Sequence, residues 1–378
     1  MKYGIKIQKK DFLKGLEKTL TVVERRNTMP SLNHALVEVK DNSLMISATD
    51  LEIFTSCEVP CQTGETGRMA IPAKQVYEIV KECDDSDAIK LKSGDGNKIE
   101  ITAGKSKFKI LGLGSDSFPH FKTSPKGQLS TAKLKCQDFI RLLQKTEHAI
   151  CLEEIRYFLT GIYLETFEKD GEKYIRAVST DGTRLALMDL PQSEVGEFSL
   201  TKGLIIPRKG ALELRRLLEG TTEEFFELTA DENLIKVQVA ENNLWIRPID
   251  GEFPDYRRVL PDNLPAKLEI SRKALAMSLR RMALLVSDRS RVVSFEFQKD
   301  KVYFTTVNPD IGEANDEVPA TFDGNEFKTG FNVKFFTDAI ANLDGDDITI
   351  QLGEKLQPAL LTSPENPGYK IVIMPMRI

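Results

Sequence analysis

One pattern of apolar residues and turns returns three times along this chain of 378 residues. Each copy opens with a strand and an amphipathic helix, continues through alternating β-branched segments, and then has a short strand that leads into a second helix. The second helices carry a lysine at the same place, at Lys74, Lys209 and Lys334. These lysines are 135 and 125 residues apart, close to one third of the chain. The repeat therefore predicts three similar structural units rather than one large domain.

The pattern within each copy predicts an α+β fold, in which every domain has two helices and a largely antiparallel sheet. Alternating runs such as ALVEV and LMISA are separated by turn residues, which is typical of hairpins, and the run FLTGIYLE at 158–165 is also expected to be a strand. Helices are expected in the windows 9–26, 74–84, 133–148, 208–219, 272–291 and 334–344. Polar, proline-bearing segments divide the chain into expected domains at 1–125, 126–264 and 265–378.

Composition excludes several classes of protein. No apolar run approaches the ~20 residues that span a bilayer, and the basic N-terminal segment has no continuous apolar core. The five cysteines are an odd number without a CxxC pair, which is typical of reduced thiols, so we expect a cytoplasmic protein without a membrane partner. The three histidines have no paired-ligand spacing, and we expect neither a metal nor any other cofactor.

No segment carries the residues of a known catalytic motif. Gly104-Lys105-Ser106 resembles the end of a phosphate-binding loop, but Ile99 stands where that loop needs its first glycine. Asp181, within STDGTR, could serve an enzyme as an acid, although Asp-Gly is more often a turn. We therefore expect that the protein is not an enzyme. A sugar- or nucleotide-modifying enzyme that uses Asp181 is a less favoured alternative.

Charge is distributed unevenly between the expected helices and the rest of the chain. The formal net charge is −5, from 52 Lys and Arg against 57 Asp and Glu, and this average argues against a nucleic-acid-binding protein. The six helical windows, however, carry a net charge of +10, which leaves −15 for strands and loops. If the helices share one side of the molecule, that side attracts a polyanion while the outside repels it. No base-reading motif is present, so we expect contacts to phosphates that do not depend on sequence.

Four segments carry a family resemblance: STDGTRLA at 179–186, IPRKG at 206–210, FPDYRRVLP at 253–261 and VIMPMRI at 372–378. Together with the repeat, they make the whole chain similar to the bacterial sliding clamp, the β subunit of DNA polymerase III. The resemblance implies a homodimer that pairs head to tail into a ring of six domains, with helices around duplex DNA and sheets outside. It also implies a processivity factor that tethers the replicative DNA polymerase and binds the clamp loader, other polymerases and repair proteins. A repeat-built protein-interaction scaffold that does not encircle DNA is the alternative.

The resemblance further implies a pocket for short peptide motifs of these partners, between the second and third domains. Its residues would be Leu159, Thr180, Gly182, Arg184, Leu185, Pro254, Arg258, Val259, Val372, Met374, Pro375, Met376 and Arg377. Methionine side chains adapt to varied apolar partners, and the arginines could bond the polar groups of a peptide. Thr183 stands where many members of the family have histidine, which could shift the preferred motif.

Further residues are expected at the DNA and at the subunit interface. By resemblance, Arg26, Tyr157 and Phe158 would contact DNA, although Phe158 lacks a hydroxyl that some relatives have and Glu153 replaces a neutral amide. Helix position and charge add Lys74, Lys209, Arg280 and Arg281 to the DNA-contacting set. The resemblance places Phe108 and Ile110 of the first domain against Leu285 and Val286 of the third domain of a second chain, a heterologous interface that closes on itself.

Overall fold

The computed structural model describes residues 4–23, 29–63, 66–85, 88–123, 129–192, 198–287, 291–353 and 357–378. These residues belong to two compact units. The first unit comprises Met1–Gln137, Val195–Leu200 and Leu212–Pro248, and the second comprises Asp138–Glu194, Thr201–Ala211 and Ile249–Ile378. Within the ranges just given, no helix is long and apolar enough to cross a membrane.

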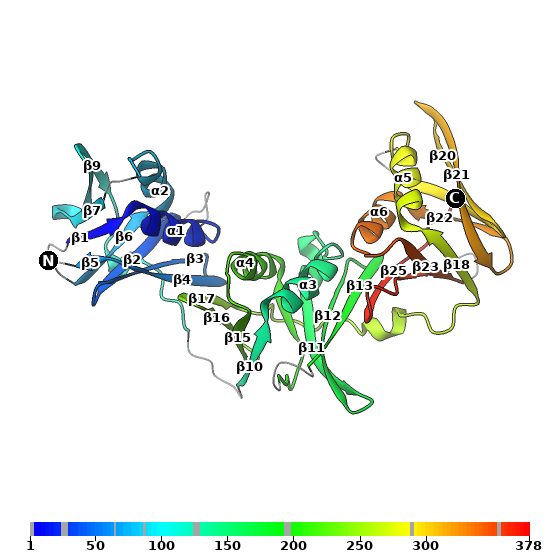
Figure 1. Cartoon of the computed structure of the whole chain (residues 1–378), viewed down its shortest axis with the longest axis horizontal. Coiled ribbons are helices and arrows are strands. Elements are labelled where there is room, and N and C mark those ends of the chain that lie inside the picture. The colour runs from blue at the N-terminus through cyan, green and yellow to red at the C-terminus, as the bar shows by residue number, and fades with distance from the viewer. Residues whose placement is uncertain are drawn as a thin grey trace. The chain divides into compact units, whose positions relative to one another are not determined.

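Two antiparallel sheets form the first unit. The smaller sheet has the order β5 (Gln62–Thr63), β1 (Gly4–Gln8), β7 (Ala88–Ser93), β8 (Lys98–Ala103), β9 (Ser106–Leu111). The larger sheet has the order β10 (Ser130–Lys135), β15 (Phe225–Ala230), β16 (Ile235–Val239), β17 (Asn242–Ile246), β4 (Ile53–Pro60), β3 (Ser43–Thr49), β2 (His34–Lys40), β6 (Gly67–Pro72). Helix α1 (Lys9–Leu20) packs against β3, β4 and helix α2 (Ala73–Lys81), as the blue part of Figure 1 shows.

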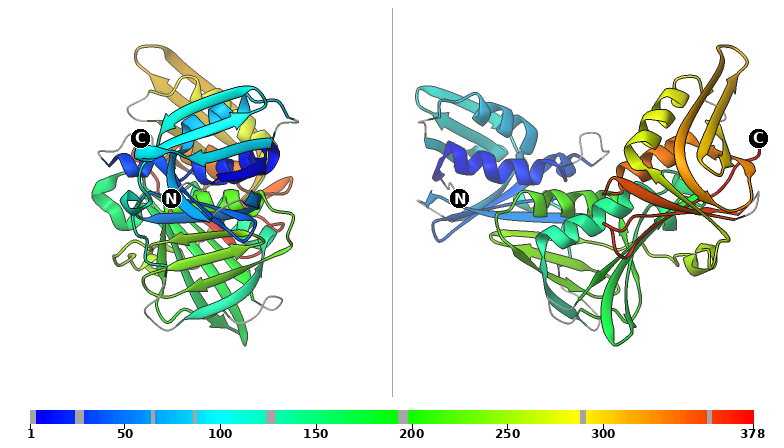
Figure 2. Two further views of the ribbon diagram at one scale, coloured as in Figure 1. Left: turned by 90° about the vertical axis from the view of Figure 1, so that its left-hand side faces the viewer. Right: turned by 45° about the vertical axis from the view of Figure 1, so that its right-hand side comes forward.

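One sheet of twelve strands organises the second unit. Its order is β14 (Leu204–Pro207), β11 (Gly161–Lys169), β12 (Glu172–Thr180), β13 (Arg184–Pro191), β25 (Tyr369–Ile373), β24 (Ala359–Thr362), β23 (Asp347–Leu352), β18 (Ala266–Ser271), β21 (Gly312–Asp323), β20 (Lys301–Asn308), β19 (Val292–Gln298), β22 (Phe327–Asn332). Helices α5 (Arg272–Ala283) and α6 (Val333–Ala341) lie side by side against this sheet, in yellow and orange in Figure 2.

The remaining helices connect these elements. Helix α3 (Cys136–Glu147) and helix α4 (Arg208–Glu219) each have residues in both units. Five short 3-10 helices are found among the described residues: η1 (Pro30–Asn33), η2 (Asp95–Asn97), η3 (Ser115–Ser117), η4 (Glu154–Leu159) and η5 (Tyr256–Val259).

Alternation of apolar and polar residues decides which face of each element is buried. In β1, Ile5 and Ile7 are buried while Lys6 between them is exposed, as a period of two requires. In α1, Phe12 and Leu16 are fully buried one helical turn apart. Each sheet therefore has an inner face under its helices and an outer face that carries polar side chains.

The predicted fold class is confirmed: every strand pair is antiparallel, and the six expected α-helices are present in the described part of the chain. Two local predictions were wrong. Phe158 and Leu159 belong to η4 and not to a strand, because the Thr160 hydroxyl donates to the Tyr157 carbonyl at 2.6 Å and closes a turn there. Val286 lies beyond α5, since the helix tightens into i→i−3 hydrogen bonds at 284 and 285.

The central repeat shares its strands between the two units. In the first unit β17 pairs with β4, with Ile246 opposite Ile53. In the second unit β13 pairs with β25, with Leu185 opposite Val372. We call the β4–β17 pairing the first junction and the β13–β25 pairing the second junction, each taken with the turn that precedes β4 or β13. Both junctions join neighbouring repeats by continuous backbone hydrogen bonding.

Candidate peptide and nucleic-acid interfaces

The turn that leads into β13 is held by two side chains of the STDGTR segment. The Thr180 hydroxyl donates to the Arg184 carbonyl at 2.6 Å and accepts the Gly182 amide at 3.0 Å. Asp181 Oδ1 accepts the backbone amides of Thr183 and Arg184 at 2.9 and 3.1 Å. Gly182 has a φ of +86°, a conformation that favours glycine. Asp181 therefore closes a turn, and this structural role explains why an Asp-Gly pair stands at this position.

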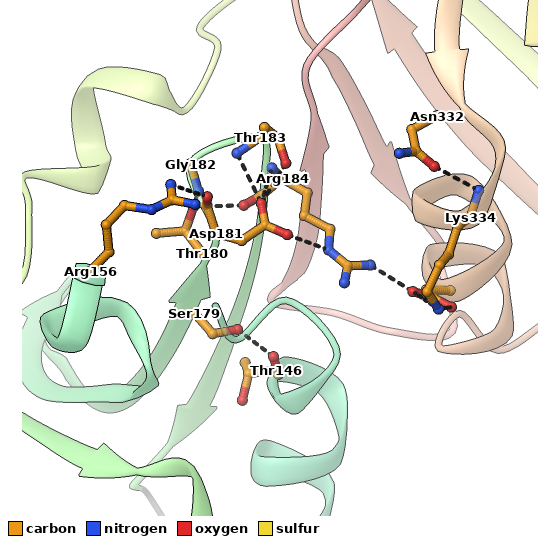
Figure 3. A network of polar contacts seen from close by, with 11 residues as sticks. Thr146, Arg156, Ser179, Thr180, Asp181, Gly182, Thr183, Arg184, Asn332 and Lys334 are labelled. Atoms are coloured by element: carbon orange, nitrogen blue, oxygen red, sulfur yellow. Dashed lines mark hydrogen bonds and ion pairs between the residues drawn. The ribbon is translucent and has the colours of Figure 1, made fainter. Parts of the chain in front are cut away.

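Arg184 connects this turn to helix α6 (Figure 3). Its Nε donates to Asp181 Oδ2 at 3.0 Å, and its Nη1 donates to Asp338 Oδ2 at 2.7 Å. The guanidinium carbon lies 4.4 Å from the centre of the Phe335 ring, and only 10% of the side chain is exposed. Two of its donor groups are thus already bound within the chain, whereas the sequence indicated a side chain free to bond a peptide.

The C-terminal segment continues β25 along the second junction. The Met374 amide donates to the Thr183 carbonyl at 2.9 Å, and the Met376 amide donates to the Gly330 carbonyl at 2.7 Å. Two backbone bonds therefore fix the last residues, while 38% of Met374 remains exposed. Beneath this segment Leu185 and Val372 belong to a buried apolar cluster that also contains Tyr256 of η5.

The thirteen residues predicted for the peptide pocket all lie in the second unit. Four of them are buried: Leu159, Thr180, Leu185 and Val372. Exposed are Gly182, Pro254, Arg258, Val259, Met374 and Arg377, and Pro375 and Met376 are half-buried. Arg258 extends into solvent and donates from Nε to Asp255 Oδ2 at 3.0 Å. The set therefore combines buried apolar side chains with exposed apolar and charged ones, the types of residue that bind short amphipathic peptides.

His148, which the sequence did not point to, lies behind the second junction. The Tyr369 hydroxyl of β25 donates to the Lys145 carbonyl at 2.6 Å. The Tyr369 oxygen also lies 3.0 Å from His148 Nε2. Because the hydroxyl proton is already used, His148 Nε2 must carry the proton of this second hydrogen bond. His148 Nδ1 is buried, and no partner for it is found among the described residues. Burial, assisted by the charge of Arg184, lowers the pKa of His148 to about 4.

The cations predicted to contact DNA are on the expected elements. Lys74 is exposed on α2 with its Nζ 3.5 Å from Glu78, and Lys209 is on α4. Arg280 and Arg281 end α5, where Arg281 donates from Nε to Asp316 at 2.9 Å. Tyr157 and Phe158 form an edge-to-face pair in η4, with ring centres 5.6 Å apart. Arg26 lies outside the described residues.

Two of the lysines counted in the helical windows are not available to a polyanion. Lys9 is 7% exposed, and its Nζ donates to the Cys83 carbonyl and to Asp85. Lys145 is 8% exposed, and its Nζ donates to the Asn342 carbonyl and to Asp344. The helices are therefore less basic on their surface than the sequence count indicated.

At the predicted subunit interface, Phe108 and Ile110 of β9 are half-buried against the first unit's core. Leu285 and Val286 are also half-buried, just beyond α5. The neighbours Leu111 and Leu284 are more exposed, at 70% and 79%, and the sequence prediction did not include them. Large apolar side chains with this much exposure are candidates for a protein interface.

Known proteins match the chain over nearly its whole length. Models of the DNA polymerase III beta subunit match residues 3–122 with its N-terminal domain, 133–255 with its central domain and 257–377 with its C-terminal domain. The beta sliding clamp of Caulobacter vibrioides is 35% identical over 373 residues, which are 98% of this chain and 99% of the relative. The chain belongs to the DNA polymerase III beta subunit family. The beta sliding clamp of Escherichia coli K12 is 28% identical over 385 residues, with the same shares of the two chains.

Solved structures of sliding clamps agree with this assignment. The beta sliding clamp of Caulobacter crescentus, solved with polyethylene glycol bound, has a TM-score of 0.94 at 33% identity. A sliding clamp from Bartonella birtlesii bound to griselimycin has a TM-score of 0.93 at 30% identity. Each comparison covers 100% of both chains. The predicted resemblance is confirmed, and it connects the chain with DNA replication.

Proposed function

We propose that the chain forms a head-to-tail homodimeric ring that encircles duplex DNA and holds the replicative polymerase on it, without catalysing a reaction itself. The observation that carries this proposal is the match to sliding clamps across all three repeats, over 98% of the chain. A ring stays on DNA by topology rather than affinity. A tether then raises the effective concentration of the polymerase at the primer end.

Contacts with DNA would come from Arg26, Lys74, Tyr157, Phe158, Lys209, Arg280 and Arg281. Exposed lysine and arginine side chains attract phosphates without reading bases, and such contacts weaken as salt rises. Arg281 would first have to leave Asp316 or share it, because its Nε already donates there. Loose contacts of this kind suit a protein that slides along the duplex.

The second junction would be the docking site for partners: the polymerase, the clamp loader, other polymerases and repair proteins. In support of this role, the thirteen predicted residues include both buried apolar side chains and exposed ones. Because Arg184 already bonds Asp181 and Asp338, its part would be to fix the wall of the pocket. Arg258 is far more exposed and bonds Asp255 through Nε, so it would reach a peptide through its Nη groups. The Bartonella birtlesii clamp binds griselimycin, and we propose that this ligand would bind the present chain at the second junction, which makes it a probe for the site.

The subunits would meet between β9, with Phe108 and Ile110, and the segment after α5, with Leu285 and Val286. The structure supports adding Leu111 and Leu284, since burial of exposed leucines favours association. We also propose that the chain has three domains, which span residues 1–125, 126–264 and 265–378.

Loading onto circular DNA tests the ring. The protein is placed on nicked circular duplex DNA by a clamp loader, the complex is isolated by gel filtration, and one sample is then cut once by a restriction enzyme. The ring predicts that protein stays on the circle and leaves the linear molecule from its ends. Equal retention on both would contradict encirclement and favour a DNA-binding scaffold. A variant with Leu284→Asp, which places a charge in the proposed interface, should not be retained on either form.

A further inference from the structure

The outer face of the five-stranded sheet in the first unit is strongly basic. Side chains on this face alternate with the buried residues of β1, β7, β8 and β9, and the charged ones are almost all lysine. We use the name lysine face for the set of six exposed lysines Lys6, Lys90, Lys92, Lys98, Lys107 and Lys109. Glu100 is the one acidic side chain among the outward residues of these four strands. The face departs from the acidic exterior that the chain's average charge indicated.

Strand register places the lysines in adjacent rows. Lys6 of β1 is directly opposite Lys90 of β7, and in the same row Thr102 of β8 is opposite Lys107 of β9. Lys92 stands two residues along from Lys90 on the same face. The rows border a shallow hollow with a volume of 640 Å³, which Gln62 of β5 also lines.

The positive charges of this face are not balanced within the chain. Glu100 accepts one ion pair, from Lys109 at 3.4 Å. In the part of the chain that the structure describes, the other five lysines have no carboxylate within ion-pair distance. Like charges directly opposite each other on neighbouring strands destabilise a sheet, so the Lys6–Lys90 pair costs folding free energy. An anionic ligand would remove that cost.

The third repeat shows that the basic face is not a requirement of the fold. Its strand β18 holds the same place before the first helix of the repeat as β1 does, and it carries both Lys267 and Glu269 on its exposed side. These two side chains pair with each other at 2.7 Å. The charges on the outer side of β18 thus cancel, whereas the only charged side chain on the outer side of β1 is Lys6.

We propose that the lysine face binds an acidic, extended peptide segment of a partner protein. In an extended peptide, side chains on one side recur about every 6.6 to 6.8 Å, the same repeat that separates Lys90 from Lys92 along β7. A peptide that runs parallel to β7 can therefore place alternate carboxylates beside Lys90 and Lys92. Gln62 and Thr102 in the hollow can bond the backbone of such a segment.

Two features favour a peptide over nucleic acid. The outward positions of these strands hold no arginine, the side chain best suited to bidentate phosphate recognition. They also hold no aromatic ring on which an unpaired base could stack. Carboxylates recognised by separate ammonium groups need neither.

The test is fluorescence anisotropy of a labelled peptide of eight residues that alternates Glu and Thr, in about 50 mM salt so that screening is weak. The substitution Lys90→Gln/Lys92→Gln removes two charges from β7, which is two strands away from the edge strand β9. A matched control, Lys169→Gln/Lys328→Gln, removes two exposed lysines at strands of the second unit. The chain itself should bind the peptide saturably, the β7 variant should bind it about fivefold more weakly, and the control should match the unaltered chain.

Four outcomes would overturn the proposal. Absence of binding to the unaltered chain would show that the face does not take an acidic peptide. Equal weakening in both variants would show that only net charge matters. Tighter binding of a single-stranded oligonucleotide, lost in the β7 variant, would assign the face to nucleic acid. Dissociation of the dimer in the β7 variant, measured by light scattering, would assign it to the subunit interface. Because no DNA or clamp loader takes part, failure of the ring proposal would leave this result unaffected.

Discussion

The first and second junctions are built on the same turn but carry different side chains. In residues 49–53 and 180–184 alike, a threonine hydroxyl donates to the carbonyl of the fifth residue, at 2.7 and 2.6 Å. An aspartate Oδ1 in each turn accepts the amides of the fourth and fifth residues. The residue just after the partner strand, Arg247 after β17 and Met374 after β25, also donates its amide at 2.9 Å to the carbonyl of the fourth residue of the turn. The repeat therefore provides one backbone arrangement twice.

Aromatic side chains fill the first junction. Phe54 of β4 lies opposite Trp245 of β17, and their rings meet edge to face at 5.2 Å. Phe121 stacks on Phe54 at 5.5 Å, and Arg247 covers Phe121 at 4.8 Å. The chain's own rings thus occupy the surface that a ligand would need.

Aliphatic side chains take the matching places in the second junction. Leu185 stands where the first junction has Phe54, and Val372 stands where it has Trp245. Leu185 and Val372 are buried in one cluster with Tyr256 and Leu360, and Phe253 and Leu260 pack at its edge. The turn alone therefore does not decide which surface a junction carries. We propose that the docking site also needs the aliphatic residues of the paired strands and the exposed Met374 beyond β25.

Removal of Met374 to Ile378 should have the largest effect on the comparison. These residues supply the exposed Met374 and the bond from Met376 to Gly330. We expect griselimycin to bind the shortened chain at least about 100-fold more weakly, measured by isothermal titration calorimetry, with the dimer unchanged. The matched change in the first junction is Arg247→Ala, which should leave the affinity as it is. Unchanged binding after the truncation would refute the second junction as the docking site.

Acid should loosen the second junction through His148. The unfolded chain binds a proton at this side chain near pH 6.5, but the folded chain does so only near its pKa of about 4. The stabilising effect of the neutral imidazole is therefore complete above pH 6.5 and is lost as pH falls toward 4, by on the order of 2 kcal/mol. Urea unfolding at several pH values measures this loss. A variant with His148→Gln should lose this part of the pH dependence, and an identical slope in both proteins would show that other groups cause it.

Exchange of the residues at the tips of the two turns should have the smallest effect, with opposite signs. Leu51 has a φ of +82° although it is not glycine, so Leu51→Gly should raise the free energy of unfolding by about 0.5 kcal/mol. At Gly182 a side chain would meet Arg156 Nη1 at 2.8 Å and share the same backbone strain. Gly182→Leu should therefore lower the free energy of unfolding by about 1.5 kcal/mol. Changes of the same sign, measured by urea unfolding, would show that the turns are not equivalent.

Much of the fold could be predicted because a period of 3.6 or 2 residues decides which face of an element is buried. The six helices and the antiparallel class follow from that pattern. Periodicity does not decide where a helix stops, and so Val286 was placed on α5 while the exposed Leu284 was missed. Nor does it show which cations are bound internally, since the partners of Lys9 and Lys145 are 76 and 199 residues away in the sequence.

Contacts between distant parts of the chain also limit what the sequence could predict about the candidate site. Its residue types were recognisable from motifs, but the bond from Arg184 to Asp338 joins positions 154 residues apart. The division of the central repeat between two sheets likewise depends on strand pairing between distant segments, which alternation within one strand cannot specify.

The contrast between the junctions can be tested most directly by hydrogen exchange with and without griselimycin. We expect ligand binding to slow amide exchange in Arg184–Pro191 and Tyr369–Ile373 and to leave it unchanged in Ile53–Pro60 and Asn242–Ile246. Slower exchange in the strands of the first junction, or in neither pair, would contradict the proposal that the second junction is the docking site and the first is not.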